Sequence, residues 1–389
     1  MKVFILGAGA TGGLLAQLLR RRRHTVWCGD RDPERACPFV GRAIECRPVN
    51  ARSIRSVVHA ARGCHLLVNA TPAVFNKTVV RAALRLGVHY LDLASHLARN
   101  PFKAEQFRFD EDFARRGRLA LINAGASPGL TNLLVAACAD TLDEVDQVRI
   151  RLFEDTESDT PVSTWSGEVA HDEAISKPRV YRQGRFRFAQ RFGEAEWFRF
   201  PKPIGEARVM LAAQDEAVTL PRFIEMNALD VKIGGNEMDR LRRWYRQGKL
   251  RPSDRRVIRR FPDTASPAEV AELMRRGQLR NARFAACVSV VGRRNRKRVE
   301  RHRCCVFPSL WQLRRNGMAG TPIAFASAQS AAVFVEHFPT HLAGVYPPEG
   351  LSAKVRASIL RGMRRRGFRI RRRTIEIGDS LKQTNKNHV

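Results

Sequence analysis

Short apolar runs alternate with amphipathic stretches over the first 125 residues of the chain. Apolar runs of this length are typical of buried strands, and apolar residues three or four positions apart are typical of helices. Strands that alternate with helices indicate a parallel, doubly wound sheet. The strands are expected at 3–6, 25–29, 65–69, 90–93 and 119–123, and the helices at 13–23, 52–61, 74–86 and 101–116.

The pattern changes after Gly129. One more helix is expected at 130–141, and the chain then continues in strand-like segments with turns and aromatic residues. The segments 284–292 and 302–307, joined by a basic turn, have the form of an antiparallel pair, and 237–280 is expected to be helical and basic. The sequence therefore predicts an α/β protein with a parallel doubly wound sheet first and a second, α+β domain built on a mostly antiparallel sheet.

The chain is strongly basic, with a formal net charge of +31. The excess lies mainly at 240–260, at 275–303 and from 354 onward. Such a field attracts polyanions, but no zinc-finger spacing and no RNA-binding sheet motif accompanies it. We therefore interpret the charge as surface arginine and expect no specific nucleic-acid partner.

The remaining composition predicts a cytoplasmic protein. No secretory signal is recognisable, and the most apolar later stretch, 323–335, is too short to span a membrane, so no membrane partner is expected. The eight cysteines include no C-x-x-C pair, and their scattered spacing is typical of reduced, packed thiols. The ten histidines show no H-E-x-x-H pattern, so no metal site is expected.

The segment Gly7-Ala8-Gly9-Ala10-Thr11-Gly12 follows the first expected strand and opens the first helix. In a dinucleotide-binding loop the first glycine permits a tight turn, the second lets the backbone approach the pyrophosphate, and the third lets helix and strand pack closely. The helix N-terminus, with Ala10 and Thr11, offers free N–H groups to the phosphates. Asp30 ends the second strand about 20 residues on, where an acid binds the ribose hydroxyls. We therefore predict a Rossmann domain that binds NAD or NADP.

The choice between the two nucleotides stays open, with NAD slightly favoured. Asp30 would repel the 2′-phosphate of NADP, whereas Arg31 could hold it. A second loop, Asn69-Ala70-Thr71-Pro72, follows the strand at 65–69, at the carboxyl edge of the sheet where the dinucleotide crosses. Asn69, Thr71 and Pro72 are therefore further cofactor-binding candidates.

Several segments carry a family resemblance. They are N-A-T-P at 69–72, L-D-L-A-S-H at 91–96, A-G-A-S-P-G-L-T-N at 124–132, G-V-Y-P-P-E at 344–349 and G-M-R-R-R-G-F-R-I-R-R-R-T at 362–374. With the glycine loop they resemble the saccharopine dehydrogenase-like family, with lysine 6-dehydrogenase as a similar short-form member. The resemblance is strong at 1–135 and 317–375. It implies an α/β catalytic domain, a last segment that returns to the Rossmann side, and hydride transfer at a carbon bearing nitrogen.

The expected domains combine the patterns with this resemblance. They are a Rossmann NAD(P)-binding domain at 1–130, a catalytic, substrate and possible dimerisation domain at 131–320, a C-terminal segment at 321–378 that returns to the Rossmann domain, and a disordered tail at 379–389.

Oxidation of an amine requires a general base, because the nitrogen has to lose its proton as hydride leaves the carbon. Asp92 and His96 flank the end of the strand after the N-A-T-P loop, and Ser127 lies in the turn before the helix at 130–141. His171, with Glu168 near it, could close over the site from the second domain. We therefore name Asp92, His96, Ser127 and His171 as catalytic candidates, although each also suits a turn, a helix cap or a solvated surface.

The sequence predicts an NAD(P)-dependent oxidoreductase that transfers hydride at the C–N bond of an amino acid, an amine or an opine-like substrate. One alternative stays open: a non-catalytic NAD(P)-binding sensor that uses its basic surface to bind nucleic acid or a protein partner. A homodimer formed through the sheet of the second domain is a further hypothesis.

Overall fold

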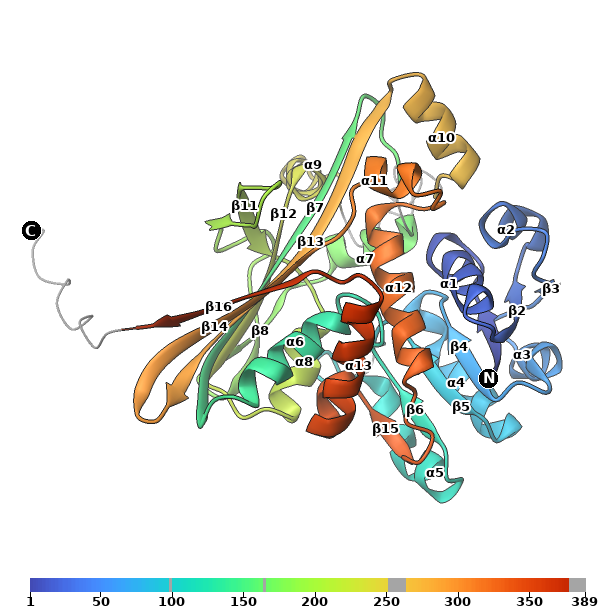
Figure 1. The fold of residues 1–389 in the computed structure, drawn as a ribbon, viewed down its shortest axis with the longest axis horizontal. Helices are drawn as coiled ribbons and strands as arrows, with labels where there is room; N and C mark the ends of the chain where they lie inside the picture. The colour runs from blue at the N-terminus through green and yellow to red at the C-terminus, as the bar shows by residue number, and fades with distance from the viewer. Residues whose placement is uncertain (98–99, 164–165, 251–263, 378–389) are drawn as a thin grey trace, which may run out of the picture.

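A computed structural model of the chain contains two large sheets (Figure 1). It describes residues 1–97, 100–163, 166–250 and 264–377, with the side chains of 168 and 169 also outside the description. The middle of the region expected to be helical at 237–280, the tail expected at 379–389 and the side chain of Glu168 therefore lie outside the described residues.

The first sheet is parallel, with seven strands in the order β15-β6-β5-β4-β1-β2-β3. The chain starts in the middle, moves to β3 at one edge and then returns to build the other side from β4. This reversal beside β1 is the switch point at which such sheets bind ligands. The strands are β1 (Lys2–Leu6), β2 (Thr25–Asp30), β3 (Cys46–Pro48), β4 (Leu66–Asn69), β5 (His89–Asp92), β6 (Leu119–Leu121) and β15 (Gly344–Tyr346).

Helices cover both faces of this sheet because successive strand residues point to opposite sides. Val3 and Ile5 pack in the core with α1 and α12, whereas Phe4 and Leu6 pack in the core with α3, α4 and α5. The expected helix at 101–116 begins later, and β3 and α2 were not expected. The helices are α1 (Ala10–Arg21), α2 (Pro33–Val40), α3 (Ile54–Ala61), η1 (Ala73–Phe75), α4 (Asn76–Leu86), η2 (Glu105–Phe109), α5 (Asp110–Arg115) and α12 (Pro322–Glu336).

The second sheet is mostly antiparallel, as the sequence predicts. Its order is β10-β11-β12-β7-β13-β14-β16, with β8 and β9 beside β12, and only the β12–β7 pair is parallel among the described strands. The strands are β7 (Glu144–Ser158), β8 (Arg179–Arg182), β9 (Arg185–Phe188), β10 (Glu196–Arg199), β11 (Glu206–Leu211), β12 (Ala228–Gly234), β13 (Leu279–Arg294), β14 (Lys297–Val306) and β16 (Ile370–Glu376).

The C-terminal part of the chain ties the two sheets together. Helix α12 packs on α1, β15 extends the parallel sheet beside β6, and β16 then joins the second sheet beside β14 (Figure 1). The resemblance implied the return to the Rossmann side but not the strand in the second sheet. The other helices are α6 (Leu130–Ala139), α7 (Gly167–Ile175), α8 (Glu216–Thr219), η3 (Leu220–Arg222), α9 (Asn236–Arg246), α10 (Pro267–Arg275), α11 (Leu310–Arg315), η5 (Pro348–Gly350) and α13 (Ala353–Arg365).

The expectation that the cysteines are reduced is wrong for one pair. Cys287 and Cys304 oppose each other in the β13–β14 ladder, and a disulfide joins them. Neighbouring residues of a strand point to opposite faces, so Cys305 is buried in the main core instead.

No helix among the residues that the structure describes has the length and apolar character needed to cross a membrane.

Candidate active site at the carboxyl edge of the parallel sheet

The glycine loop connects β1 to α1, and each glycine meets a different constraint. Gly7 has φ of +92°, a left-handed conformation that favours glycine. A Cβ atom at Gly12 would lie 1.8 Å from the carbonyl oxygen of Gly7, so only glycine allows this close approach. A Cβ at Gly9 would meet nothing within 4 Å. The space over Gly9 is therefore free for a pyrophosphate, and Ala10 and Thr11 open the helix beside it.

Asp30, at the end of β2, is held against this loop. Its Oδ2 accepts a hydrogen bond from the Ala8 N–H at 2.8 Å, and its Oδ1 accepts one from the Asp32 N–H at 3.1 Å. The carboxyl is half-buried, and the side chain of Arg31 is exposed. This arrangement suits a carboxylate that accepts from ribose hydroxyls, although it uses Asp30 to fix the loop as well.

The N-A-T-P loop is stiffened from within by Asn69. The Asn69 Oδ1 accepts from the Thr71 N–H at 3.2 Å and the Thr71 hydroxyl at 2.6 Å, and its Nδ2 donates to Asn76 at 2.8 Å. Asn69 is buried, whereas Thr71 and Pro72 keep part of their surface. Direct contact of all three with the cofactor stays a prediction, and for Asn69 the geometry favours a role in shaping the loop.

Asp92, at the end of β5, is fully enclosed. It accepts hydrogen bonds from the Tyr90 hydroxyl at 3.0 Å, the Gln106 amide at 2.9 Å and the Asn123 N–H at 2.8 Å. Burial raises the pKa of Asp92 to about 7. With 1% of its surface accessible, Asp92 acts on its neighbours and positions the loop after β6.

His96, after β5, is held by a contact with Glu105. Its Nδ1 lies 2.9 Å from the Glu105 carboxylate, which also pairs with Arg108 at 3.3 Å. The side chain is half-buried. A catalytic role for His96 stays a prediction, and the contact with Glu105 gives it a structural role.

The second domain supplies carboxyls that were not among the predicted candidates. Asp215 and Glu216 begin α8, and the Ser95 N–H donates to Asp215 Oδ2 at 2.8 Å. Ser127 and Thr131, before and within α6, donate their hydroxyls to Glu216 Oε1. The predicted candidate Ser127 therefore faces a buried carboxyl.

Asp215 differs from its neighbours because part of its surface is accessible, whereas Glu216 is fully buried. Burial raises the pKa of Asp215 to about 7, the Ser95 N–H opposes this, and the nearby Glu216 adds to it. A partly accessible carboxyl that titrates near neutral pH suits a general base.

A third buried carboxyl, Glu349, comes from η5. Its Oε1 accepts from the Asn132 amide at 3.0 Å, and burial raises its pKa to about 7. The Oε2 atoms of Glu216 and Glu349 and the Nδ2 atom of Asn123 have no hydrogen-bond partner within the described residues. Buried polar atoms of this kind normally have partners, so these three suit contacts with a bound group.

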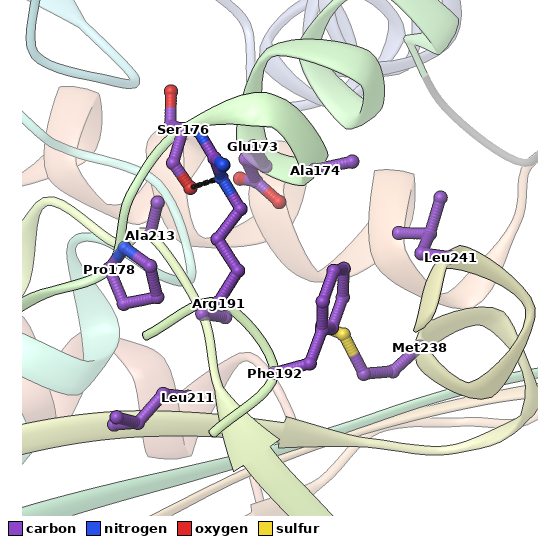
Figure 2. A pocket seen from close by; sticks show the side chains of 11 residues that line it. Glu173, Ala174, Ser176, Pro178, Arg191, Phe192, Leu211, Ala213, Met238 and Leu241 are labelled. Carbon is purple, nitrogen blue, oxygen red and sulfur yellow. Dashed lines mark hydrogen bonds between the residues drawn. The ribbon is translucent and has the colours of Figure 1, made fainter. Parts of the chain in front are cut away.

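Helix α7 carries a further carboxyl, Glu173, near Asp215 and Glu216. The pKa of Glu173 is raised well above its usual range, first by burial and then by Glu154, with Asp215 and Glu216 adding to the shift. Glu173 also borders a cavity of about 20 Å³, large enough for a water molecule but not for an amino acid. Figure 2 shows Glu173 of α7 on one side of this cavity, with Met238 of α9 and Phe192 across from it.

The predicted candidate His171 lies on the same helix and is buried. Burial lowers its pKa, and the adjacent Asp172 opposes that effect. Its participation in catalysis stays a prediction.

We define the acidic cluster as the carboxyls gathered at this edge of the parallel sheet. Within the described residues no group of three or more candidate ligands is arranged to hold a metal ion. One signal in the sequence could have revealed part of the cluster: the acids Asp215 and Glu216 interrupt an otherwise apolar stretch, where charges are costly unless they have a function. The members of the acidic cluster are Asp92, Glu173, Asp215, Glu216 and Glu349.

Residues 3–121 match the model of the saccharopine dehydrogenase NADP-binding domain. This part of the chain is therefore similar to the NADP-binding domain of saccharopine dehydrogenase. The N-terminal domain is thus an NAD(P)-binding Rossmann domain, as the glycine loop predicts, and both NAD and NADP are consistent with it.

Two solved structures share the fold of this protein over nearly its whole length. Saccharopine dehydrogenase (L-Glu forming) from Saccharomyces cerevisiae has a TM-score of 0.71 and 11% identity, covering 96% of this chain and 99% of the other. Homospermidine synthase from Legionella pneumophila, solved in complex with NAD, has a TM-score of 0.70 and 11% identity, covering 100% and 94%. At this identity the likeness shows the fold.

One curated protein is similar to this chain in sequence. Carboxynorspermidine synthase from Vibrio cholerae is 26% identical over 202 residues. The match spans 49% of this chain and about half, 49%, of that relative's length. Together with the match of the NADP-binding domain, these likenesses support an NAD(P)-binding oxidoreductase.

Gly9→Val should abolish cofactor binding without unfolding the protein. The backbone of Gly9, with φ of −74°, is open to valine, and no protein atom lies within 4 Å of the new Cβ. The branched side chain would occupy the space of the pyrophosphate, so we expect affinity for NADH to fall about 100-fold or more. Calorimetric titration measures the affinity and a thermal melt checks the fold. Unchanged affinity would refute the assignment of this loop.

Asp30→Asn should weaken NAD more than NADP. The charge that repels a 2′-phosphate is lost, while an amide oxygen remains to accept the Ala8 N–H. A charged hydrogen bond contributes about 1.5–3 kcal/mol, so the ratio of NADH to NADPH affinity should shift by roughly tenfold or more. Fluorescence titration at high salt measures both nucleotides, with Asp32→Asn as the control. A shift in the opposite direction would mean that the 2′ position is recognised elsewhere.

Glu349→Gln should stabilise the protein at pH 8. The folded-state pKa of Glu349, about 7, lies above its ordinary 4.5. Its contribution to stability is therefore present at low pH and lost as pH rises through 7, and the ionised form costs up to about 3 kcal/mol. Glutamine keeps an oxygen for Asn132. Urea unfolding at pH 8 should show a gain that disappears at pH 4.

The exposed Glu206, which pairs with Arg199, provides the matched control. Glu206→Gln should change stability by less than about 0.5 kcal/mol at either pH. A loss of stability for Glu349→Gln at pH 8 would show that the carboxylate is compensated in the folded protein.

Proposed function

We propose that this protein is an NAD(P)-dependent oxidoreductase that transfers hydride at the C–N bond of an amine or amino acid. The observation that carries the proposal is the convergence of the acidic cluster with the loops after β4, β5 and β6, at the edge where the dinucleotide crosses. An amine is positively charged at neutral pH, so carboxyls suit both its binding and its deprotonation.

Asp215 is the group that we assign as the general base. Its carboxyl is partly accessible, and the Ser95 N–H fixes its orientation. With a pKa near 7 it takes the ammonium proton only above that pH, so the amine becomes neutral next to the hydride acceptor that the bound nicotinamide supplies. If an imine is then hydrolysed, the same carboxyl is positioned to activate the water.

The excess of carboxyls supports a substrate with more than one amino group. Arg179 is the cation whose charge lowers the pKa of Asp215. The Arg179 Nε already donates a hydrogen bond to the Pro101 carbonyl oxygen at 2.6 Å. In addition, two of the similar proteins, a homospermidine synthase and a carboxynorspermidine synthase, are named after polyamines. We therefore place di- and polyamines beside lysine and saccharopine as substrates to test.

The test measures cofactor binding and turnover separately. The full chain is titrated with NADH and NADPH at high salt, and NAD(P)H formation is then followed with lysine, saccharopine, putrescine and spermidine. Asp215→Asn should lower kcat about 100-fold or more with unchanged cofactor affinity, and the wild-type rate of oxidation should rise with pH through about 7.

Asp172→Asn on α7 is the matched control, because Asp172 is exposed, and it should keep wild-type kcat. Full activity in Asp215→Asn would overturn the assignment of the base. Nucleotide binding without turnover of any of these amines would count against the oxidoreductase and favour the sensor.

A further inference from the structure

Arginines from the two ends of the chain meet at a surface remote from the acidic cluster. Arg22, after α1, and Arg366, after α13, both bond the Glu336 carboxylate at the end of α12, at 3.0 and 3.2 Å. We call the surface around this contact the arginine patch. Its members are Arg22 and Arg366, which bind Glu336, Arg361 and Arg365, whose charges act on His337 next to Glu336, and their chain neighbours Arg20, Arg21, Arg23 and Arg364.

The positive charge of the patch is mostly uncompensated. All its arginines except Arg22 are exposed, and Glu336 is the acid with which they form ion pairs among the described residues. The field extends to His337, whose pKa is lowered by burial first and then by Arg365, Arg361 and Arg366, against the influence of Glu336.

Arginine at a helix C-terminus has an ordinary structural role, because it complements the helix dipole. Arg20 and Arg21 lie in the last turn of α1, and Arg364 and Arg365 in the last turn of α13. A helix end carries only about half an elementary charge, so the dipoles and Glu336 together offset a minor part of the patch. The rest needs another explanation.

The chemistry of the patch identifies the class of partner. None of the large apolar side chains that are exposed in the described residues belongs to α1, α12 or α13, so these helices carry no exposed apolar anchor for a protein hot spot or a membrane and no exposed ring for stacking on a base. Guanidinium groups bind phosphate oxygens in a bidentate manner. The exposed apolar side chains are Val74, Phe188, Trp197, Phe223, Tyr245 and Trp311.

We propose that the arginine patch binds the sugar–phosphate backbone of nucleic acid without recognising its sequence. The patch and the glycine loop lie at opposite ends of α1, whose 12 residues span roughly 18 Å. Nucleic acid and the dinucleotide therefore bind at the same time. This function is independent of the oxidoreductase activity.

The test is fluorescence anisotropy of the full chain with two labelled 20-base-pair DNA duplexes of unrelated sequence, between 50 and 200 mM salt. We expect equal affinity for both duplexes and a log–log salt slope of about −0.9 for each phosphate contacted. The triple variant Arg361→Gln, Arg364→Gln, Arg365→Gln should lose about tenfold in affinity at 100 mM salt, with a slope shallower by roughly 2 to 3.

The matched control removes the same charge from another basic surface. Arg81, Arg85 and Arg116 line a shallow hollow over α4 and α5. Their triple replacement by Gln should change affinity by less than about threefold.

Equal losses in the two triple variants would overturn the patch, because binding would then follow net charge alone. Overturning results would also be no binding to either duplex at 100 mM salt, or binding to anionic phosphatidylglycerol vesicles but not to DNA. Thermal melts of both variants identify a loss that is due to unfolding, and in that case single Arg361→Gln and Arg365→Gln variants decide by the same criterion.

Discussion

The arrangement of the site depends on hydrogen bonds from residues at the carboxyl edge of the parallel sheet and the start of α6 to carboxyls of α8 and η5. The Ser95 N–H reaches Asp215, the hydroxyls of Ser127 and Thr131 reach Glu216, and the Asn132 amide reaches Glu349. Burying a carboxyl is costly unless donors surround it or a proton neutralises it. These contacts therefore fix the loops after β5 and β6 against α8 and η5.

The same burial gives the site its chemistry. Carboxyls in water are ionised at neutral pH and are poor proton acceptors there, but Asp92, Asp215 and Glu349 each have a pKa raised to about 7. The nearby Glu216 adds to the raised pKa of both Asp215 and Glu349. Accessibility is what separates Asp215 from the enclosed members.

Helix α1 runs from the glycine loop at its N-terminus to the arginine patch at its C-terminus. Its N-terminus opens over the glycine loop, where backbone N–H groups attract phosphate, and its C-terminus ends in Arg20 and Arg21. Helix α12 packs along it and carries Glu336, which binds Arg22 and Arg366. A segment from the end of the chain thereby completes the surface that α1 begins.

The sequence by itself determined the features whose signals are local. Strand and helix periodicity predicted most elements of the parallel sheet and the β13–β14 pair of the second sheet. The glycine spacing with Asp30 predicted the nucleotide loop, because the close approach of Gly12 to Gly7 involves neighbours in the chain. Segments that carry no periodic signal, such as β3, escaped prediction. The resemblance implied the return of the C-terminal segment, which β15 makes, but not β16 in the second sheet.

Only the tertiary structure decided which groups share the site. Ser95 and Asp215 are 120 residues apart, and Asn132 and Glu349 are 217 apart, so no spacing in the sequence relates them. The raised pKa values of Asp215 and Glu349 arise from burial at a contact between distant elements, and amino-acid composition does not reveal such a contact. The disulfide between Cys287 and Cys304 and the arginine patch have the same origin, because strand register and helix packing bring their members together.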